Sequence, residues 1–85
     1  MQDRIPSISA GHRLQWESQL QHYILLYPEG LVKLNASAAY IFRLCDGKNS
    51  VQDILSILNG RFPDREVDRD VIHFLMVAYE KGWLK

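Results

Sequence analysis

Three histidines and one cysteine are the residues of this sequence best suited to metal binding or nucleophilic catalysis. His12, His22 and His73 are scattered along the chain, and their spacing matches no pattern of metal ligands, with or without the cysteine. Cys45 lies in an apolar helical pattern, where a buried thiol behaves as a small hydrophobic group and is not ionised. We therefore expect neither a metal site nor a catalytic cysteine.

Two aspartates, Asp68 and Asp70, could be considered as a general acid and a general base. Both stand near the start of a predicted helix, where acidic side chains stabilise the positive end of the helix dipole. This placement explains them without any catalytic role. The chain also has no glycine-rich loop of the kind that binds phosphate groups. The sequence thus predicts a protein that is not an enzyme, with no catalytic residue and no bound cofactor.

The chemistry that the sequence does favour is backbone hydrogen bonding at the edge of a sheet. Residues 23–34, YILLYPEGLVKL, predict two strands around a turn at Pro28 to Gly30. The residues from Asn35 onward are helix-forming, so no further strand is expected beside residues 31–34. The amide and carbonyl groups of such an open edge can pair with another polypeptide. Open edges are, however, often only shielded by short length and by a charge, a role that Lys33 would fill here.

A sheet and a set of helices must position that edge, and their patterns are visible along the chain. Leu14 and Trp16 alternate with polar residues, which is typical of a half-buried strand. Asn35 and Ser50 are suitable residues to cap the first turn of a helix. The expected strands are at about residues 12–17, 22–27 and 31–34, and the expected helices at about 36–45, 51–59 and 65–81.

The composition is that of one small folded domain, because the chain has 85 residues of which 47% are hydrophobic. We predict a flexible N-terminal arm at residues 1–10 and an α+β domain at residues 11–85. This domain is expected to be winged helix-turn-helix-like, with a three-stranded antiparallel sheet followed by three helices. A net charge of zero, a single cysteine and the lack of a signal or membrane segment favour a soluble, cytoplasmic protein. They give no reason to expect a nucleic acid or a membrane as partner.

The third predicted helix is apolar over a wider arc than one core contact requires. Its core face is formed by Val67, Val71, Phe74, Leu75 and Ala78. Ile72, Met76 and Tyr79 form an adjoining apolar flank at helical spacing. Two interpretations are open for this flank: it packs under the sheet or the N-terminal arm, or it lines a binding groove.

A winged-helix DNA-binding regulator is the alternative function that the predicted elements allow. The exposed face of the third helix would then present Glu66, Arg69, His73 and Glu80, a mixed set that repels about as many phosphates as it attracts. DNA binding is therefore less favoured than protein binding. A plain oligomerisation module that uses the same strand edge is a third possibility, and either a monomer or a dimer is compatible with the sequence.

A family resemblance extends over residues 4–84, nearly the whole chain. It is present in GHRLQWE at 11–17, LLYPEGLVKLN at 25–35, A-x-x-I-x-x-L-C-D-G at 38–47, SV at 50–51, FP at 62–63, DV at 70–71, FL at 74–75 and GWL at 82–84. In this order and spacing the strings strongly resemble the pyrroloquinoline quinone (PQQ) biosynthesis protein D family. The resemblance implies a recognition element of a ribosomal-peptide (RiPP) pathway that acts as a peptide chaperone. Its partners would be the precursor peptide, protein A of the PQQ pathway, and the radical S-adenosylmethionine (SAM) enzyme, protein E.

The resemblance also implies where the peptide binds, because related domains add the leader segment as a strand beside their third strand and against their third helix. Carried onto this chain, the peptide-binding residues are Leu31, Val32, Lys33 and Leu34 on the strand, and Asp70, Ile72, His73, Met76 and Tyr79 on the helix. We further expect Leu34 to be a core residue, because it immediately precedes a capped helix. The surface for the enzyme is left open among the N-terminal arm, Arg13 and the region of the second helix.

Overall fold

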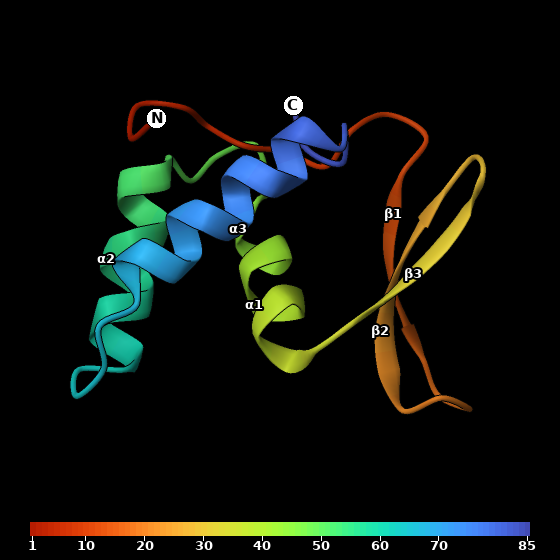
Figure 1. The fold of residues 1–85 in the computed structure, drawn as a ribbon, viewed down its shortest axis with the longest axis horizontal. Coiled ribbons are helices and arrows are strands. Elements are labelled where there is room, and N and C mark those ends of the chain that lie inside the picture. Colours follow the sequence, from red (N-terminus) through yellow and green to blue (C-terminus); the bar gives the residue numbers. More distant parts are fainter.

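The computed structural model describes residues 1–85, in which three strands precede three helices (Figure 1). The elements are β1 (Arg13–Glu17), β2 (His22–Tyr27), β3 (Gly30–Leu34), α1 (Ala36–Leu44), α2 (Val51–Arg61) and α3 (Asp68–Glu80). This order confirms the predicted α+β class. The boundaries agree with the expected ones to within one residue, except that α2 continues past Gly60 to Arg61 and α3 begins at Asp68 instead of Arg65. None of the helices has the length and the apolar character needed to cross a membrane.

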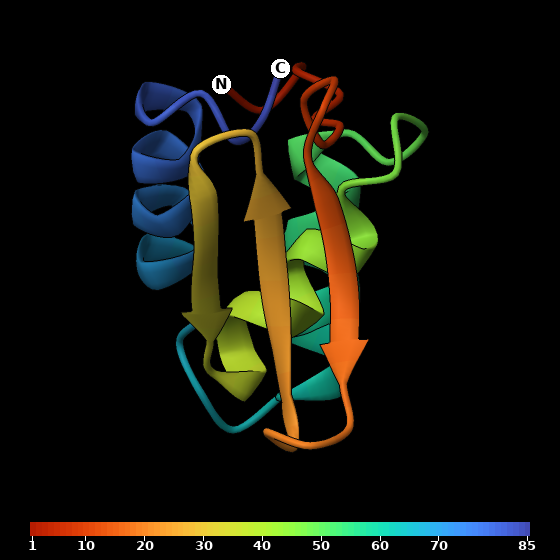
Figure 2. The same cartoon turned by 90° about the vertical axis from the view of Figure 1, so that its right-hand side faces the viewer.

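The sheet is an antiparallel meander in the order β1-β2-β3, so β1 and β3 are both edge strands. Tyr27 pairs with Gly30 across a two-residue turn at Pro28 and Glu29. Gly30 has a φ of 156° and Gly11, before β1, has a φ of 77°, values that favour glycine. All three helices lie on one side of the sheet (Figure 1), and α3 runs beside β3, at the edge opposite β1 (Figure 2).

The core lies between the sheet and the helices. Leu25 on the central strand, Phe42 on α1 and Leu75 on α3 are at most 1% exposed, and Leu55 of α2 joins the same cluster. The predicted caps position the helices: the Asn35 side chain accepts a hydrogen bond from the Ala38 amide at 2.8 Å. Ser50 and Asp53 form a reciprocal capping box, with bonds of 3.0 and 2.9 Å. These local signals are confirmed.

The N-terminal segment is bound to the domain, which differs from the flexible arm that we expected. Pro6 is fully buried, and the Arg4 carbonyl accepts a hydrogen bond from the Val51 amide at 2.8 Å. Ser7 and Ile8 form isolated bridges to Asp46 and Leu84. The reason is tertiary, because Pro6 is buried at the end of the helical layer, and the backbone of Ser7 and Ser9 pairs with that of Lys85 and Trp83.

Candidate functional site

The outer edge of β3 is the unpaired backbone surface that the sequence predicted, and the outer edge of β1 has no strand partner either. Tyr27 and Gly30 flank a two-residue turn and must therefore be a hydrogen-bonded pair, and bonding alternates from there along the antiparallel ladder. Val32 accordingly exchanges hydrogen bonds with β2, whereas the amide and carbonyl groups of Leu31 and Lys33 point outward. No strand of the chain pairs with this side of β3. We call the outward groups of Leu31 and Lys33 the β3 edge.

The side chains of β3 alternate between the core and the surface. Leu34 is 5% exposed and belongs to the core cluster, as predicted, and Val32 packs against that cluster. Leu31 and Lys33 are exposed on the opposite face of the sheet, with Leu31 at 49%. A strand added at this edge would therefore lie beside apolar side chains on the inner face of the sheet, and beside one apolar and one charged side chain on the outer face.

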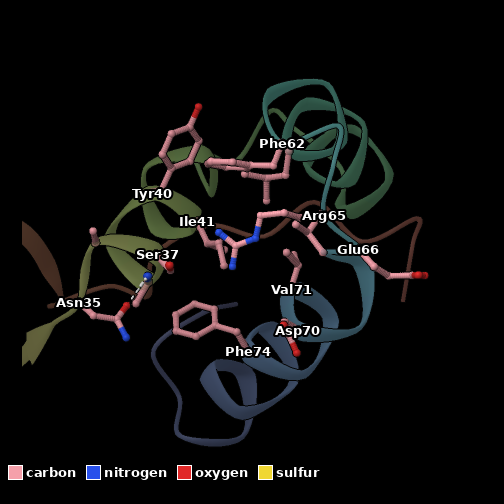
Figure 3. Close-up of a pocket in the computed structure, with 14 residues that line it drawn as sticks. Asn35, Ser37, Tyr40, Ile41, Phe62, Arg65, Glu66, Asp70, Val71 and Phe74 are labelled. Carbon is pink, nitrogen blue, oxygen red and sulfur yellow. Dashed lines mark hydrogen bonds between the residues drawn. The ribbon is translucent and has the colours of Figure 1, made fainter.

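The flank of α3 that faces the end of β3 is formed by Asp70 and Phe74. Figure 3 shows both side chains across a cavity from Asn35 and Ser37, which follow β3 directly. Phe74 is half-buried and makes an edge-to-face contact with Phe42, with ring centres 5.1 Å apart. This cavity begins at Asn35, the residue after β3, and reaches the start of α3, and we call it the β3–α3 groove.

The β3–α3 groove has a volume of about 520 Å³. It lies between the start of α1, the end of α2 and the start of α3, and apolar residues predominate in its wall. The lining residues are Asn35, Ala36, Ser37, Ala38, Tyr40, Ile41, Leu58, Phe62, Arg65, Glu66, Val67, Asp70, Val71 and Phe74. Its size and lining suit a large apolar side chain of a bound peptide. Polar residues next to that side chain in the peptide would meet Arg65, Glu66 and Asp70, which carry charges of both signs.

Three of the predicted helix residues, Ile72, Met76 and Tyr79, lie on the other flank of α3. At 100° per residue they stand about 140–160° around the helix from Phe74. The Tyr79 ring lies under the guanidinium of Arg4, 3.8 Å from its centre, and Met76 is 54% exposed. Tyr79 thus packs under the N-terminal arm, as one interpretation of this flank predicted. Helical geometry turns all three residues away from the flank that lines the cavity, and their contact with a peptide stays a prediction. The contact with Arg4 could not be recognised from helical periodicity.

The remaining predicted residues divide between the groove and the outer surface. Asp70 lines the cavity, whereas His73 is exposed on the outer side of α3. Phe74 was assigned to the core alone, and the cavity residues Phe62 and Arg65 were not predicted as site residues. The sequence marks Phe62 and Arg65 only as part of a phenylalanine-proline turn between two predicted helices. Such turns are too common to identify a cavity.

The residues considered for chemistry stand apart from one another. No group of three His, Cys, Asp or Glu side chains is placed to hold a metal ion. Burial, with a smaller contribution from the charge of Asp46, raises the pKa of the Cys45 thiol to about 12. The Cys45 thiol donates to the Ile41 carbonyl at 3.3 Å, and His22 Nδ1 donates to the Leu34 carbonyl at 3.2 Å. The two hydrogen bonds stabilise local structure.

Comparison with known proteins identifies a family and several relatives. The family model described as coenzyme PQQ synthesis protein D (PqqD) matches residues 22–84. A protein of Klebsiella pneumoniae named PqqA binding protein is 46% identical over 81 residues, which cover 94% of this chain and 88% of that relative. A PqqA binding protein of Pseudomonas aeruginosa is 42% identical over 84 residues, covering 98% of this chain and 91% of the relative.

A solved structure shares the fold over the full length of the chain. It is the solution NMR structure of the PqqD truncation of Methylobacterium extorquens PqqCD, described as a functional, stand-alone RiPP recognition element. The TM-score is 0.79 at 26% sequence identity, and the match covers 100% of this chain and 93% of the other.

Proposed function

Because this chain belongs to the coenzyme PQQ synthesis protein D family, we propose that it is a peptide chaperone of PQQ biosynthesis. It binds the precursor peptide, protein A of the pathway, and holds it for modification. The relatives named PqqA binding protein and the structural likeness to a RiPP recognition element support this role. The observation that carries it on this chain is the unpaired β3 edge beside the β3–α3 groove.

The peptide binds as a fourth strand of the sheet. Its backbone pairs with the outward amide and carbonyl groups of Leu31 and Lys33, which supply up to four hydrogen bonds at roughly 1 kcal/mol net each. Alternate peptide side chains point inward, toward Val32 and Phe74, and an apolar anchor enters the cavity near Asp70. Two such anchors add roughly 1.5–3 kcal/mol each, from which the ordering of a flexible peptide subtracts several kcal/mol. The balance suits reversible binding and release.

The chaperone presents the bound peptide to the radical SAM enzyme, protein E of the pathway. The role proposed for this chain is binding, which agrees with a single thiol that is buried and has its pKa raised to about 12. A strand held at the rim of a small sheet leaves the rest of the peptide free to enter the active site of another protein. This arrangement separates recognition of the peptide from its chemistry.

The winged-helix architecture also invites comparison with DNA-binding proteins, but the surface of α3 argues against that function. Its exposed positions include Arg69, Asp70, His73 and Glu80, so positive and negative charges alternate on the face that would enter a groove of DNA. The net charge of zero gives no long-range attraction for phosphates either.

Amide chemical-shift mapping during titration with synthetic precursor peptide tests the proposal directly. We expect the largest shifts at residues 31–34 and at the Asp70 and Phe74 flank of α3. Shifts centred on Tyr79 and the N-terminal segment would place the peptide on the wrong flank and refute the groove, and an absence of shifts at saturating peptide would refute the chaperone role.

A further inference from the structure

A second surface adjoins the β3–α3 groove and extends from it across α1 to β1 and β2. It contains two adjoining hollows of about 370 and 330 Å³, which share Tyr40 and Arg43. We call it the aromatic–arginine surface and define it by Trp16, Tyr23, Tyr40, Arg43 and Arg61, which come from β1, β2, α1 and α2. The proposed strand addition at β3 makes no use of it.

The charge of the aromatic–arginine surface is uncompensated. The first hollow is lined by Trp16, Gln21, His22, Tyr23, Leu34, Asn35, Ala36, Ala39, Tyr40 and Arg43, and the second by Tyr40, Arg43, Leu44 and Arg61. No carboxylate is among them. The guanidinium of Arg43 lies 5.9 Å from the centre of the Tyr23 ring, and that of Arg61 lies 5.7 Å from the centre of the Tyr40 ring. Both arginines are exposed and can therefore receive external carboxylates.

The same surface exposes a large aromatic side chain. Trp16 is 49% exposed, although its ring meets that of Tyr23 edge-to-face at 5.2 Å between centres. Tryptophan, tyrosine and arginine are the residues that most often dominate the energy of protein–protein interfaces. The first hollow has an exposed tryptophan, each hollow has at least one arginine, and no carboxylate lines either of them, which is the composition of such an interface.

The position of the aromatic–arginine surface allows it to be occupied together with the groove. On α1, Ile41 lines the cavity of the groove and Arg43 lines the two hollows, and these residues stand about 160° apart around the helix. Tyr40 borders all three spaces, with its ring edge-to-face to Phe62 on the groove side at 6.2 Å between centres. A partner bound here would lie next to the end of β3, where the proposed peptide strand begins or ends.

We propose that the aromatic–arginine surface docks an acidic face of a protein, in which carboxylates pair with Arg43 and Arg61 and an apolar side chain packs against Trp16. Under the proposed function, on which the identity of this partner rests, the protein is the radical SAM enzyme that receives the peptide. Docking next to the end of β3 keeps the peptide within reach of the enzyme. Charge complementarity also speeds association and fixes the orientation of the two proteins.

A pair of matched charge reversals tests this docking. The variant Arg43→Glu with Arg61→Glu is compared with Lys48→Glu with Lys85→Glu, which changes the net charge equally at exposed residues outside the surface. Affinity for the purified enzyme is measured by calorimetry, and peptide binding by chemical-shift mapping. We expect the arginine variant to lose roughly tenfold or more in enzyme affinity, with thermal stability and peptide-induced shifts retained, and the lysine variant to resemble the wild type.

Three results would overturn the docking proposal. Equal enzyme affinity of the arginine variant and the wild type would exclude the surface. Failure of the wild-type protein to bind the enzyme, while the peptide still binds at β3, would exclude this partner and leave the peptide-binding function standing. A phosphate site would be identified instead by two results together. Inorganic phosphate would cause saturable chemical shifts of the Arg43 and Arg61 side chains, and neither charge reversal would change the affinity for the enzyme.

Discussion

At the scale of single residues, the two flanks of α3 are chemically similar and differ in what covers them. Phe74 borders the cavity next to the end of β3, whereas Tyr79 is stacked under Arg4 of the N-terminal segment. Both are aromatic, half-buried and at helical spacing from core residues. A binding role therefore follows from the neighbours of each side chain and not from its type.

Substitutions on the two flanks should separate their roles. Phe74→Ala is expected to weaken binding of the precursor peptide and to lower the free energy of unfolding by about 1–3 kcal/mol, because a half-buried ring in contact with Phe42 is lost. Met76→Asp is the comparison, since Met76 is 54% exposed and away from β3, and it should change stability by no more than about 0.5 kcal/mol and leave the affinity unchanged. Calorimetric titration and thermal melts measure both quantities; a loss of peptide affinity in Met76→Asp would contradict the assignment of the groove.

The buried thiol gives a pH-dependent contribution to stability. The pKa of Cys45 is raised from 9.0 to about 12 by burial, so the folded state retains a proton that the unfolded state has lost between these values. The contribution is fully present below pH 9 and disappears as the pH rises toward 12. Thermal melts should show a steeper loss of stability over this range for the wild type than for Cys45→Ala, and parallel curves would contradict the raised pKa.

At the scale of elements, the backbone of β3 is hydrogen-bonded to β2 along one side and has no strand partner along the other. The hairpin and the alternation of its side chains could be predicted from residues 23–34. The register was not, because the turn was expected at Pro28 to Gly30, whereas Gly30 belongs to β3 and pairs with Tyr27. The outward direction of the Lys33 amide is a consequence of that register. The strand is consequently stable as part of the domain and still available to another chain.

Proline substitutions in β3 test which amides point outward. Lys33→Pro removes an outward donor and should weaken peptide binding roughly tenfold, since a hydrogen bond of about 1 kcal/mol is lost and the ring hinders the approaching strand. The fold and the melting temperature should change little. Val32→Pro removes a donor to β2 instead and should unfold or strongly destabilise the domain. If the Lys33→Pro variant unfolds while the Val32→Pro variant folds, the Lys33 amide is bonded to β2 and the Val32 amide points outward, which contradicts the register described.

At the scale of the whole molecule, a net charge of zero and a strand edge predict binding that depends little on salt. Peptide affinity measured between about 50 and 300 mM salt should change by no more than a few-fold, because backbone hydrogen bonds and apolar anchors release few counterions. The steep loss expected of a phosphate-driven complex would favour the DNA-binding alternative. Duplex DNA titrated under the same conditions provides the comparison.

The sequence by itself determined the features that depend on neighbours along the chain: the hairpin, the caps at Asn35 and Ser50, the core position of Leu34 and the order of the elements. Each of these rests on turn geometry, capping or periodicity within a few residues. Only the tertiary structure decided which flank of α3 lies beside β3, and that residues 4–9 pair with residues far along the chain. Periodicity defines an apolar arc on a helix, but the partner of each part of that arc is set by packing between distant segments, which no local pattern encodes.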